Sequence, residues 1–326
     1  MKIVVLHGEI PDEASVDELD TLDQVDIISE ALKDLGHEPV PVAVSMNLAQ
    51  MAETLGAIGP DTVFNLVEAL NGRGNLIHVA PSVLDTIGIP YTGATAESIF
   101  LTSNKIVAKK ILKGAGIPTI PWWSHGDGTD NGFSGGRYIF KSVWEHASIG
   151  IDESSLVDIS SPEQLHKALD DFRVKLRGPC LAEPFVEGRE FNLAVLAGER
   201  GHQVLPPAEV RFNNYPEGKP KLLTYRAKRN EESFEFQNIL ACFDFTEEDG
   251  PLLSRLKDIT NQCWETFGLK GYARIDFRVD KNGTPWVMEI NTNPCLSPDG
   301  GFAWCVEEAG ISFKDAVSRI IDDSLR

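Results

Sequence analysis

The segment from Gly271 to Leu296 constrains the fold more than any other, because it predicts a β-hairpin whose register can be worked out. Apolar residues alternate with polar ones along residues 272–279 and again along residues 286–291. Between the two runs lies Asn282-Gly283, a strong hairpin signal because both residues tolerate positive φ. With these two residues as the loop, one face of the hairpin is apolar throughout. The predicted apolar pairs are Ile275–Ile290, Phe277–Met288 and Val279–Trp286.

The same register places two carboxylates directly opposite each other on the other face. Asp276 faces Glu289, and Arg274 faces Asn291. Opposed side chains have Cβ atoms about 4.5–5.5 Å apart, where like charges are destabilising. A shared divalent cation would offset the repulsion, because carboxylate and amide oxygens are the ligands that Mg²⁺ prefers. The alternative is a solvated face on which the acids pair with Arg274 and Arg278.

A polar loop follows the acidic strand directly. Residues 291–301 contain two prolines and two glycines and lead away from Asn291. Binding residues are often carried by such loops on a rigid scaffold. This loop therefore favours a binding site over a merely solvated face.

Composition limits the partners of the chain. It has 326 residues, of which 30 are Lys or Arg and 49 are Asp or Glu, for a formal net charge of −19. That charge would repel nucleic acid and anionic membranes. No apolar run approaches the ~20 residues of a membrane helix, and the first residues lack a signal-peptide pattern. Five cysteines form no CxxC pair, so we expect reduced thiols and a cytoplasmic protein.

The chain is long enough for two or three domains. Strands alternate with helices up to about residue 94, which predicts a doubly wound domain with a parallel sheet. This region has neither a dinucleotide-binding glycine motif nor a P-loop. Its expected elements are strands at Lys2–Leu6, Val40–Val44 and Thr62–Val67, a helix around Leu22–Leu35 that Gly36 ends, and a helix around Leu76–Ile87.

The remaining chain predicts mixed α and β structure in two further units. We expect domains at residues 1–94, 95–186 and 187–326. Ser103 can cap a helix that runs to Leu112, and Ser161-Pro162 starts another that runs to about Arg173. The expected strands are Thr119–Trp123, Arg137–Val143, Cys180–Val186 and Phe191–Leu196.

Seven fragments of the sequence carry a further signal. The hairpin run Gly271–Phe277 with Val287–Pro294 is the most specific of them, and the others, in chain order, are Ile89–Gly93, Asn104-Lys105, Gly114–Pro118, Phe140-Lys141, Glu183–Phe191 and Tyr225–Lys228. Together and in this order they resemble the D-alanine–D-alanine ligase group of the ATP-grasp enzymes. The resemblance spans most of the chain and implies an N-terminal α/β domain followed by a two-lobed ATP-grasp fold.

The resemblance also implies roles for individual residues. ATP and Mg²⁺ (or Mn²⁺) would be bound, with the nucleotide gripped between the two lobes. The implied ATP-binding residues are Lys105 and Lys141 for the phosphates, Ser148 in a loop that covers them, Glu183, Phe185 and Val186 for adenine, and Glu190 for the ribose. The implied metal ligands are Asp276, Glu289 and Asn291, and the implied catalytic residues are Arg274 and Lys228.

Departures from the family pattern fall where the substrates would bind. Gly300 stands where a serine would hold a substrate carboxylate, beside Gly301. The loop serine falls at Ala147, and the tyrosine that follows the lid lysine falls at Arg229. Glu13 is one of three acidic residues, with Asp12 and Glu18, that could contact a substrate amine. Cys295 replaces a glycine, and we interpret it as a bulkier residue rather than a nucleophile.

The implied reaction joins a carboxylate to an amine. ATP would phosphorylate the carboxylate, and the amine would then displace phosphate to give an amide. The expected partners are amino-acid or small carboxylate substrates and a second copy of the chain in a homodimer. Two alternatives stay open: an ATP-binding regulatory protein that has lost ligation, and a kinase without an amine step.

Overall fold

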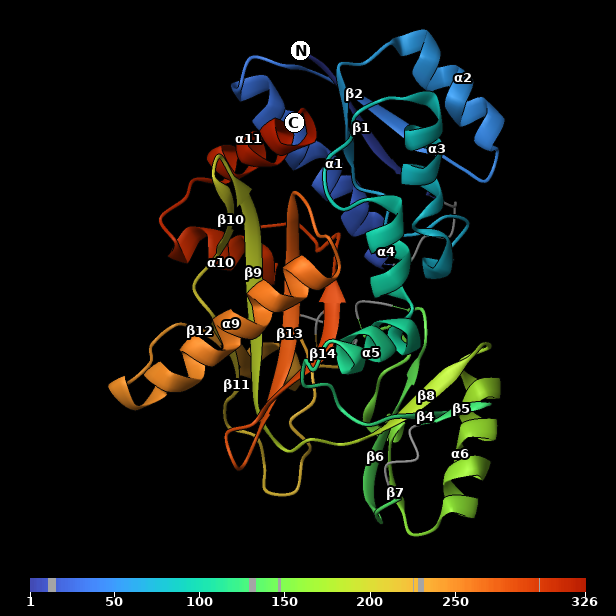
Figure 1. The fold of residues 1–326 in the computed structure, drawn as a ribbon, viewed down its shortest axis with the longest axis vertical. Helices are drawn as coiled ribbons and strands as arrows, with labels where there is room; N and C mark the ends of the chain where they lie inside the picture. Colours follow the sequence, from blue (N-terminus) through green and yellow to red (C-terminus); the bar gives the residue numbers. More distant parts are fainter. Residues whose placement is uncertain (11–15, 129–132, 146–147, 225, 228–231, 299) are drawn as a thin grey trace.

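The computed structural model describes residues 1–326 except residues 11–15, 129–132, 146–147, 225, 228–231 and 299. Three sheets organise the chain in sequence order (Figure 1). The first is parallel, and the other two are antiparallel throughout their described ladders. This is the mixed α/β architecture expected from the sequence.

The N-terminal sheet has the strand order β2-β1-β3. Alternate residues of its central strand β1 pack on opposite faces: Ile3 and Val5 in one apolar core, Val4 and Leu6 in another. Helices cover both faces, which confirms the doubly wound prediction. The elements are β1 (Lys2–Gly8), α1 (Val16–Asp34), β2 (Glu38–Val44), α2 (Leu48–Ile58), β3 (Thr62–Asn65), η1 (Gly74–Leu76) and α3 (Val79–Ile87).

Two short helices, α4 (Ala96–Ser103) and α5 (Lys105–Gly114), lead into the second sheet. This sheet has the order β5-β4-β8-β6-β7, with α6 on one face. Ser161 caps α6 through the N–H of Gln164, as predicted. The elements are β4 (Trp123–Ser124), β5 (Asp127–Gly128), β6 (Gly136–Ser142), η2 (Glu153–Ser155), β7 (Leu156–Ile159), α6 (Pro162–Lys175) and β8 (Cys180–Pro184).

Two local predictions in this region were wrong. Residues 119–123 do not form a continuous strand, because Pro121 cannot donate to a ladder; Thr119 makes only an isolated bridge to Val287. Ser103 is not the cap of α5 but the last residue of α4. Asn104 caps α5, accepting hydrogen bonds from two backbone N–H groups of the first turn.

The third sheet has the order β12-β11-β9-β13-β14, with β10 also paired to β9. Helix α9 lies across this sheet, and α10 and α11 lie toward the N-terminal sheet (Figure 1). The elements are β9 (Gly188–Gly198), β10 (Gly201–Val204), β11 (Ala208–Phe212), α8 (Phe234–Asn238), β12 (Ile239–Cys242), η3 (Glu247–Asp249), α9 (Gly250–Thr266), β13 (Tyr272–Asp280), β14 (Pro285–Asn291), α10 (Gly301–Glu308) and α11 (Phe313–Ser324).

The β13–β14 hairpin has the predicted register in one half only. Arg274, Ile275 and Asp276 face Asn291, Ile290 and Glu289 as expected, but the register shifts by one residue after Asp276. The predicted pairs Phe277–Met288 and Val279–Trp286 were therefore wrong. The observed pairs are Phe277–Val287, Arg278–Trp286 and Val279–Pro285.

The shift has two physical causes. The Asp280 N–H donates to the backbone oxygen of Thr284 at 3.0 Å, so the loop between this pair contains three residues rather than two. The Asp280 carboxylate holds this loop, because it accepts the N–H groups of Asn282 and Thr284 at 2.8 and 3.0 Å. A β-bulge then places two residues of β14 opposite one of β13. The buried positions of β14 are Pro285, Val287 and Ile290, and the two-residue spacing becomes three across the bulge.

The cores connect these sheets unequally. One apolar core joins the N-terminal sheet and α1 to β9, α10 and α11 of the third unit. The second sheet has a core of its own with α6, around Phe140 and Phe172, whose rings stack at 4.4 Å. The first and third sheets thus share one body, against which the second sheet stands as a separate layer. The domain limits at residues 94 and 186 stay predictions.

Candidate active site

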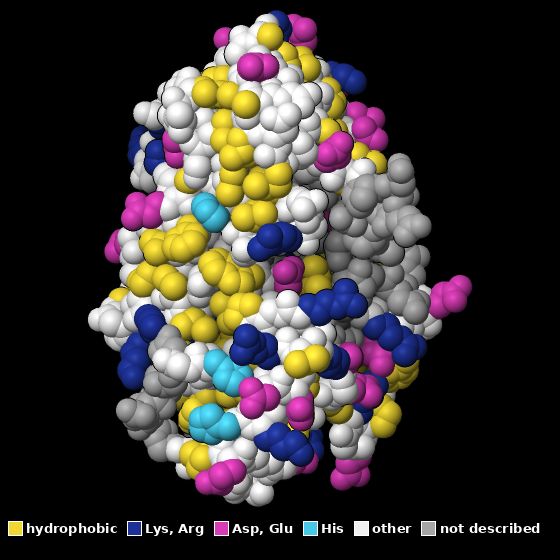
Figure 2. Space-filling model, turned by 90° about the vertical axis from the view of Figure 1, so that its right-hand side faces the viewer, with side chains coloured by type: hydrophobic (Ala, Val, Ile, Leu, Met, Phe, Trp, Pro, Cys, Tyr) yellow, Lys and Arg dark blue, Asp and Glu magenta, His cyan; other side chains and the backbone are white. Residues whose placement is uncertain are grey.

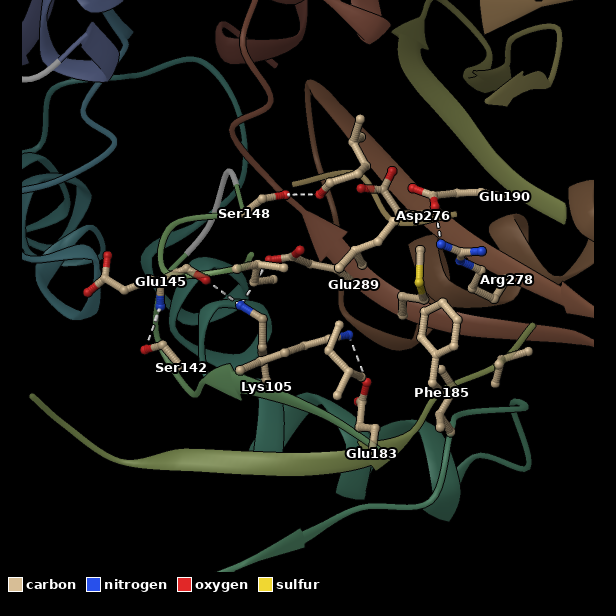
Figure 3. Close-up of a pocket in the computed structure, with 18 of the residues that line it drawn as sticks. Lys105, Ser142, Glu145, Ser148, Glu183, Phe185, Glu190, Asp276, Arg278 and Glu289 are labelled. Atoms are coloured by element: carbon tan, nitrogen blue, oxygen red, sulfur yellow. Dashed lines mark hydrogen bonds and ion pairs between the residues drawn. The ribbon is translucent and has the colours of Figure 1, made fainter. Parts of the chain in front are cut away.

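A cavity with an empty volume of about 840 Å³, which includes open solvent, lies between the second and third sheets. Strands β6 and β8 supply one wall, and β9, β13 and β14 supply the other (Figure 3). Figure 2 shows side chains of both charge signs near the middle of one face, despite the acidic excess of the chain. The cavity is lined by Lys105, Lys141, Ser148, Glu183, Phe185, Val186, Glu190, Asp276 and Glu289, all predicted from the sequence as ATP or metal residues.

Asp276, on the wall that β13 and β14 form, accepts hydrogen bonds from three side chains. Arg274 contacts both of its oxygens, through Nε at 2.8 Å and Nη2 at 2.9 Å. Asn192 and Asn291 donate to it at 2.7 and 3.0 Å. Burial alone would lower the pKa of Arg274, but the neighbouring Asp276 outweighs burial and raises that pKa. Arg274 therefore stays charged.

Glu289 faces Asp276 across the hairpin but has its own cation. Lys105 Nζ lies 3.1 Å from Glu289 Oε1 and also donates to the backbone oxygen of Glu145. The opposed carboxylates are thus compensated separately, by Arg274 and by Lys105. The alternative prediction, in which the acids pair with arginines, therefore holds for Asp276 but not for Glu289. Because each carboxylate has a nearby cation, the repulsion between the two does not by itself require a metal.

Glu183 is the carboxylate of the opposite wall, and two lysines hold it. Lys109 Nζ lies 2.5 Å from one of its oxygens and Lys141 Nζ lies 2.7 Å from the other. Burial would raise the pKa of Glu183, but these two lysines outweigh burial and lower the pKa to about 2. The carboxyl group of Glu183 is consequently ionised, and it orients Lys141 at the edge of the cavity.

Lys109 was missed by the sequence reasoning. Its side chain is 2% exposed, and its amine also donates to the backbone oxygen of Ile120 at 2.9 Å. Its position in the sequence could have indicated a buried lysine. Lys109 lies one helical turn after Lys105 on α5, whose buried residues also include Ala108 and Leu112. A lysine on an apolar helix face requires a buried partner.

The other end of the cavity is more apolar. Phe185, Val186 and Met288 line it, and Met288 reaches it because the bulge of β14 turns it away from the buried face. Glu190 on β9 forms an ion pair with Arg278 on β13 at 2.8 Å. A planar apolar group with polar edges would fit this end.

Some predicted residues lie beside the cavity or outside the described residues. Arg274 and Asn291 contact Asp276 without lining the cavity themselves. Ser148 lines it, and its hydroxyl donates to the backbone oxygen of Leu223 at 2.9 Å. The predicted residues outside the described part of the chain are Glu13, Ala147, Lys228 and Arg229.

Gly300 precedes α10 and Gly301 begins it, with Gly301 beside Arg274. A Cβ atom added to Gly301 would lie 3.7 Å from Arg274 Nη1, an ordinary contact. A Cβ added to Gly300 would lie 2.9 Å from the backbone oxygen of Ser297, so a serine there would displace the loop. The local backbone therefore requires glycine at this position, so Gly300 differs from the family's serine by more than the loss of a hydroxyl.

Cys295 has no feature of an activated nucleophile. Its thiol lies 3.3 Å from Asp20 Oδ2. Burial, with added negative charge from Glu68 and Asp20, raises the pKa of Cys295 to about 12. The protonated thiol supports the interpretation of Cys295 as a packing residue.

The possible metal ligands are limited to a small set. The described residues contain no group of three or more His, Cys, Asp and Glu side chains suited to a metal. Asp276 and Glu289, with the amide of Asn291, are hard oxygen donors of the kind that Mg²⁺ prefers. No helix in the described ranges is long and apolar enough to cross a membrane.

Comparisons with known proteins give consistent results. A family model for the C-terminus of D-ala D-ala ligase matches residues 137–322. The chain is 30% identical to the D-alanine–D-alanine ligase of Aquifex aeolicus, with 98% of this chain and 100% of the relative covered. It is 28% identical to the uncharacterized protein y4sG of Sinorhizobium fredii, with 91% and 86% covered. Among solved structures, D-alanine–D-alanine ligase from Bacillus anthracis complexed with ATP has a TM-score of 0.75 at 22% identity, with 100% and 98% covered.

Proposed function

The chain belongs to the D-alanine–D-alanine ligase family, and on that premise we propose that it is an ATP-dependent ligase that joins a carboxylate to an amine. The observation that carries the proposal is the cavity between two walls of different charge. Lysines project from one wall, and carboxylates with an adjacent arginine line the other. Such a site neutralises triphosphate charge while it leaves room for a second anionic reactant.

ATP would lie with its phosphates toward Lys105 and Lys141. Its base and sugar would lie at the apolar end, near Phe185 and Glu190. Asp276, Glu289 and Asn291 would hold Mg²⁺, which supplies charge neutralisation at the phosphate oxygens. Their donor chemistry fits this ion, since all three offer oxygen atoms.

The residues would then act by positioning and by charge. A substrate carboxylate oxygen attacks the γ-phosphorus of ATP, and ADP leaves, which gives an acyl phosphate. The amine of the second substrate attacks the acyl carbon, loses a proton and expels inorganic phosphate. Arg274, held by Asp276 and always charged, would stabilise the negative oxygen of the tetrahedral intermediate.

The substrates are amino acids or small carboxylates in this proposal, and D-alanine is one candidate. At the start of α10, the backbone N–H of Gly301 and Arg274 would bind a carboxylate, because the N–H of Gly300 already donates to the backbone oxygen of Ser297 at 2.8 Å. We expect this site to accept substrates other than D-alanine for at least one position. The homodimer and the cytoplasmic location also stay predictions.

A substrate panel tests the proposal. ADP release is measured with D-alanine alone, then with pairs of amino acids and carboxylates, and products are identified by mass spectrometry. A pair that yields ADP, phosphate and an amide in equal amounts supports ligation. A phosphorylated product without amide under saturating amine would favour the kinase, and ATP binding without stimulation by any pair would favour the regulatory alternative.

A further inference from the structure

Arg278 has a hydrogen-bond donor that no described residue accepts. Its side chain is 4% exposed, and its Nη1 atom is buried without an acceptor among the residues that the structure describes. The Nη2 atom, in contrast, donates to Glu190 Oε2 at 2.8 Å and to the backbone oxygen of Lys221. Buried polar groups are rarely left without a partner, so the orphaned donor needs an explanation.

The position of Arg278 indicates the kind of partner that is missing. Arg278 lines the cavity at its apolar end, two residues after Asp276 on the same face of β13 (Figure 3). The rings of Phe185 and Phe212 lie 5.4 and 5.9 Å from its guanidinium carbon. These contacts and the ion pair fix the guanidinium, and a fixed donor is suited to selecting one acceptor.

The charge balance excludes a phosphate as the intended acceptor. Glu190, directly opposite Arg278 in the β9–β13 ladder, already neutralises the guanidinium. A phosphate is better served on the opposite wall, where both Lys109 and Lys141 contact one carboxylate of the described residues, Glu183. The partner of Nη1 is therefore a neutral oxygen or nitrogen.

We propose that Arg278 is a nucleotide-binding residue that donates through Nη1 to a ribose hydroxyl of ATP. A hydroxyl both donates and accepts, and the Arg278–Glu190 pair offers a donor and a carboxylate acceptor side by side. Vicinal ribose hydroxyls match this pair, whereas a purine edge would use only one half of it. The inference rests on the proposal that the cavity binds ATP.

Binding measurements with sugar-modified nucleotides test the assignment. Arg278→Lys keeps the positive charge beside Glu190 but removes Nη1. We expect the dissociation constant for ATP with Mg²⁺, measured by calorimetry, to rise about five- to tenfold, as for one lost hydrogen bond. Removal of the contacted hydroxyl, in 2′-deoxy-ATP or 3′-deoxy-ATP, should weaken binding to the original protein but not further to Arg278→Lys.

Two controls separate the possible failures. Arg189→Lys changes an arginine that pairs with Glu209 and Asp249 outside the cavity, and it should leave ATP affinity unchanged. 7-Deaza-ATP alters the base and should weaken both proteins equally. If Arg278→Lys does not fold, Arg278→Gln, which keeps a donor for Glu190, takes its place.

The outcomes distinguish the inference from the proposed function. Unchanged ATP affinity in Arg278→Lys, or equal losses for both deoxy nucleotides in both proteins, would overturn the ribose contact alone. Failure of the original protein to bind ATP would overturn the proposed function and this inference with it. Loss of the preference for one hydroxyl, with unchanged melting temperature, supports the assignment.

Discussion

The two walls of the cavity balance buried charge in different ways. On the wall of β13 and β14, Asp276 forms an ion pair with Arg274, and Glu289 forms one with Lys105. On the opposite wall, the single carboxylate Glu183 lies between two lysines. Among the described residues, the second set has more basic than acidic side chains, although burial lowers the pKa of Lys109.

This difference indicates that the two walls have different roles in the proposed ligase. We call the wall with Asp276 and Glu289 the carboxylate wall, and the wall with Glu183 and its two lysines the lysine wall. The lysine wall can attract a phosphate without any added ion. The wall of β13 and β14 presents the carboxylates Asp276 and Glu289 to the cavity, so we expect a phosphate to bind there only with a further cation. Variants on the two walls should therefore have different defects. A change on the carboxylate wall should alter the dependence on metal, and a change on the lysine wall should reduce stability and phosphate binding.

The largest effect is expected for Asp276→Asn. This change keeps the shape of the side chain but removes the charge that Arg274 and a metal would share. We expect the rate of ADP release with an accepted substrate pair to fall about 10²–10³-fold, the usual loss for one element of transition-state stabilisation. A titration with Mg²⁺ should also need a higher concentration for half-maximal rate.

Glu187→Gln is the matched control for this variant. Glu187 pairs with Lys281 at an exposed position outside the cavity. Its replacement should change the rate less than twofold. A rate for Asp276→Asn within tenfold of the original would contradict the assignment of Asp276 to the reacting end of the cavity.

The second effect is on the opposite wall, in Lys109→Met. Glu183 then loses the more deeply buried of its two cations and keeps only Lys141 at the edge of the cavity, so we expect a loss of about 3–5 kcal/mol in the free energy of unfolding. Urea denaturation followed by circular dichroism measures it. Lys113→Met, at the exposed end of the same helix, should cost less than about 0.5 kcal/mol. Equal losses in the two variants would show that the Glu183 pair contributes nothing.

The carboxylate wall could be predicted from the sequence because its two carboxylates lie on one hairpin, close together along the chain. Alternation along one hairpin was enough to place Asp276 opposite Glu289. The predicted register was wrong beyond Asp276, because the side chain of Asp280 organises the loop and because a bulge exposes Met288 to the cavity. Neither the side-chain contacts of Asp280 nor the bulge can be predicted from the alternation of apolar residues.

The lysine wall could not be predicted in the same way. Lys109 and Glu183 lie on a helix and a strand of separate regions, and only the tertiary fold brings them together. Lys141 and Glu183 were named through the family resemblance, without any indication that they contact each other. The orphaned donor of Arg278 likewise depends on packing by Phe185 and Phe212, which no sequence period encodes.

A third effect depends on pH. The pKa of Glu183, about 2 in the folded chain, lies below its ordinary value of 4.5. Its charged form therefore stabilises the fold fully above about pH 4.5, and this contribution is lost as the pH falls toward 2. Relative to Glu183→Gln, the original protein should gain on the order of 3 kcal/mol at pH 7.

Denaturation of both proteins at several pH values between 7 and 3 checks this expectation. The gap between their free energies of unfolding should shrink as the solution becomes more acidic. A gap that stays constant across this range would contradict the ionised state of Glu183. Added salt should change the gap little, because the side chain is 1% exposed and poorly screened.

The smallest effect concerns the helix that connects the two walls. Lys105 and Lys109, four residues apart on α5, reach Glu289 on one wall and Glu183 on the other. Asn104 fixes the start of this helix, because its side chain accepts the N–H groups of Ile106 and Val107 at 3.1 Å each. Asn104→Ala should cost about 1 kcal/mol of stability.

The same variant should also weaken ATP binding two- to fivefold, since both lysines move with the frayed turn. Asn47→Ala provides the comparison, because Asn47 caps α2 beside the N-terminal sheet, away from the cavity. Its stability loss should match that of Asn104→Ala, whereas its ATP affinity should not change. If calorimetry gives the two variants the same affinity for ATP, α5 does not couple the walls, and each wall then binds its part of the nucleotide independently.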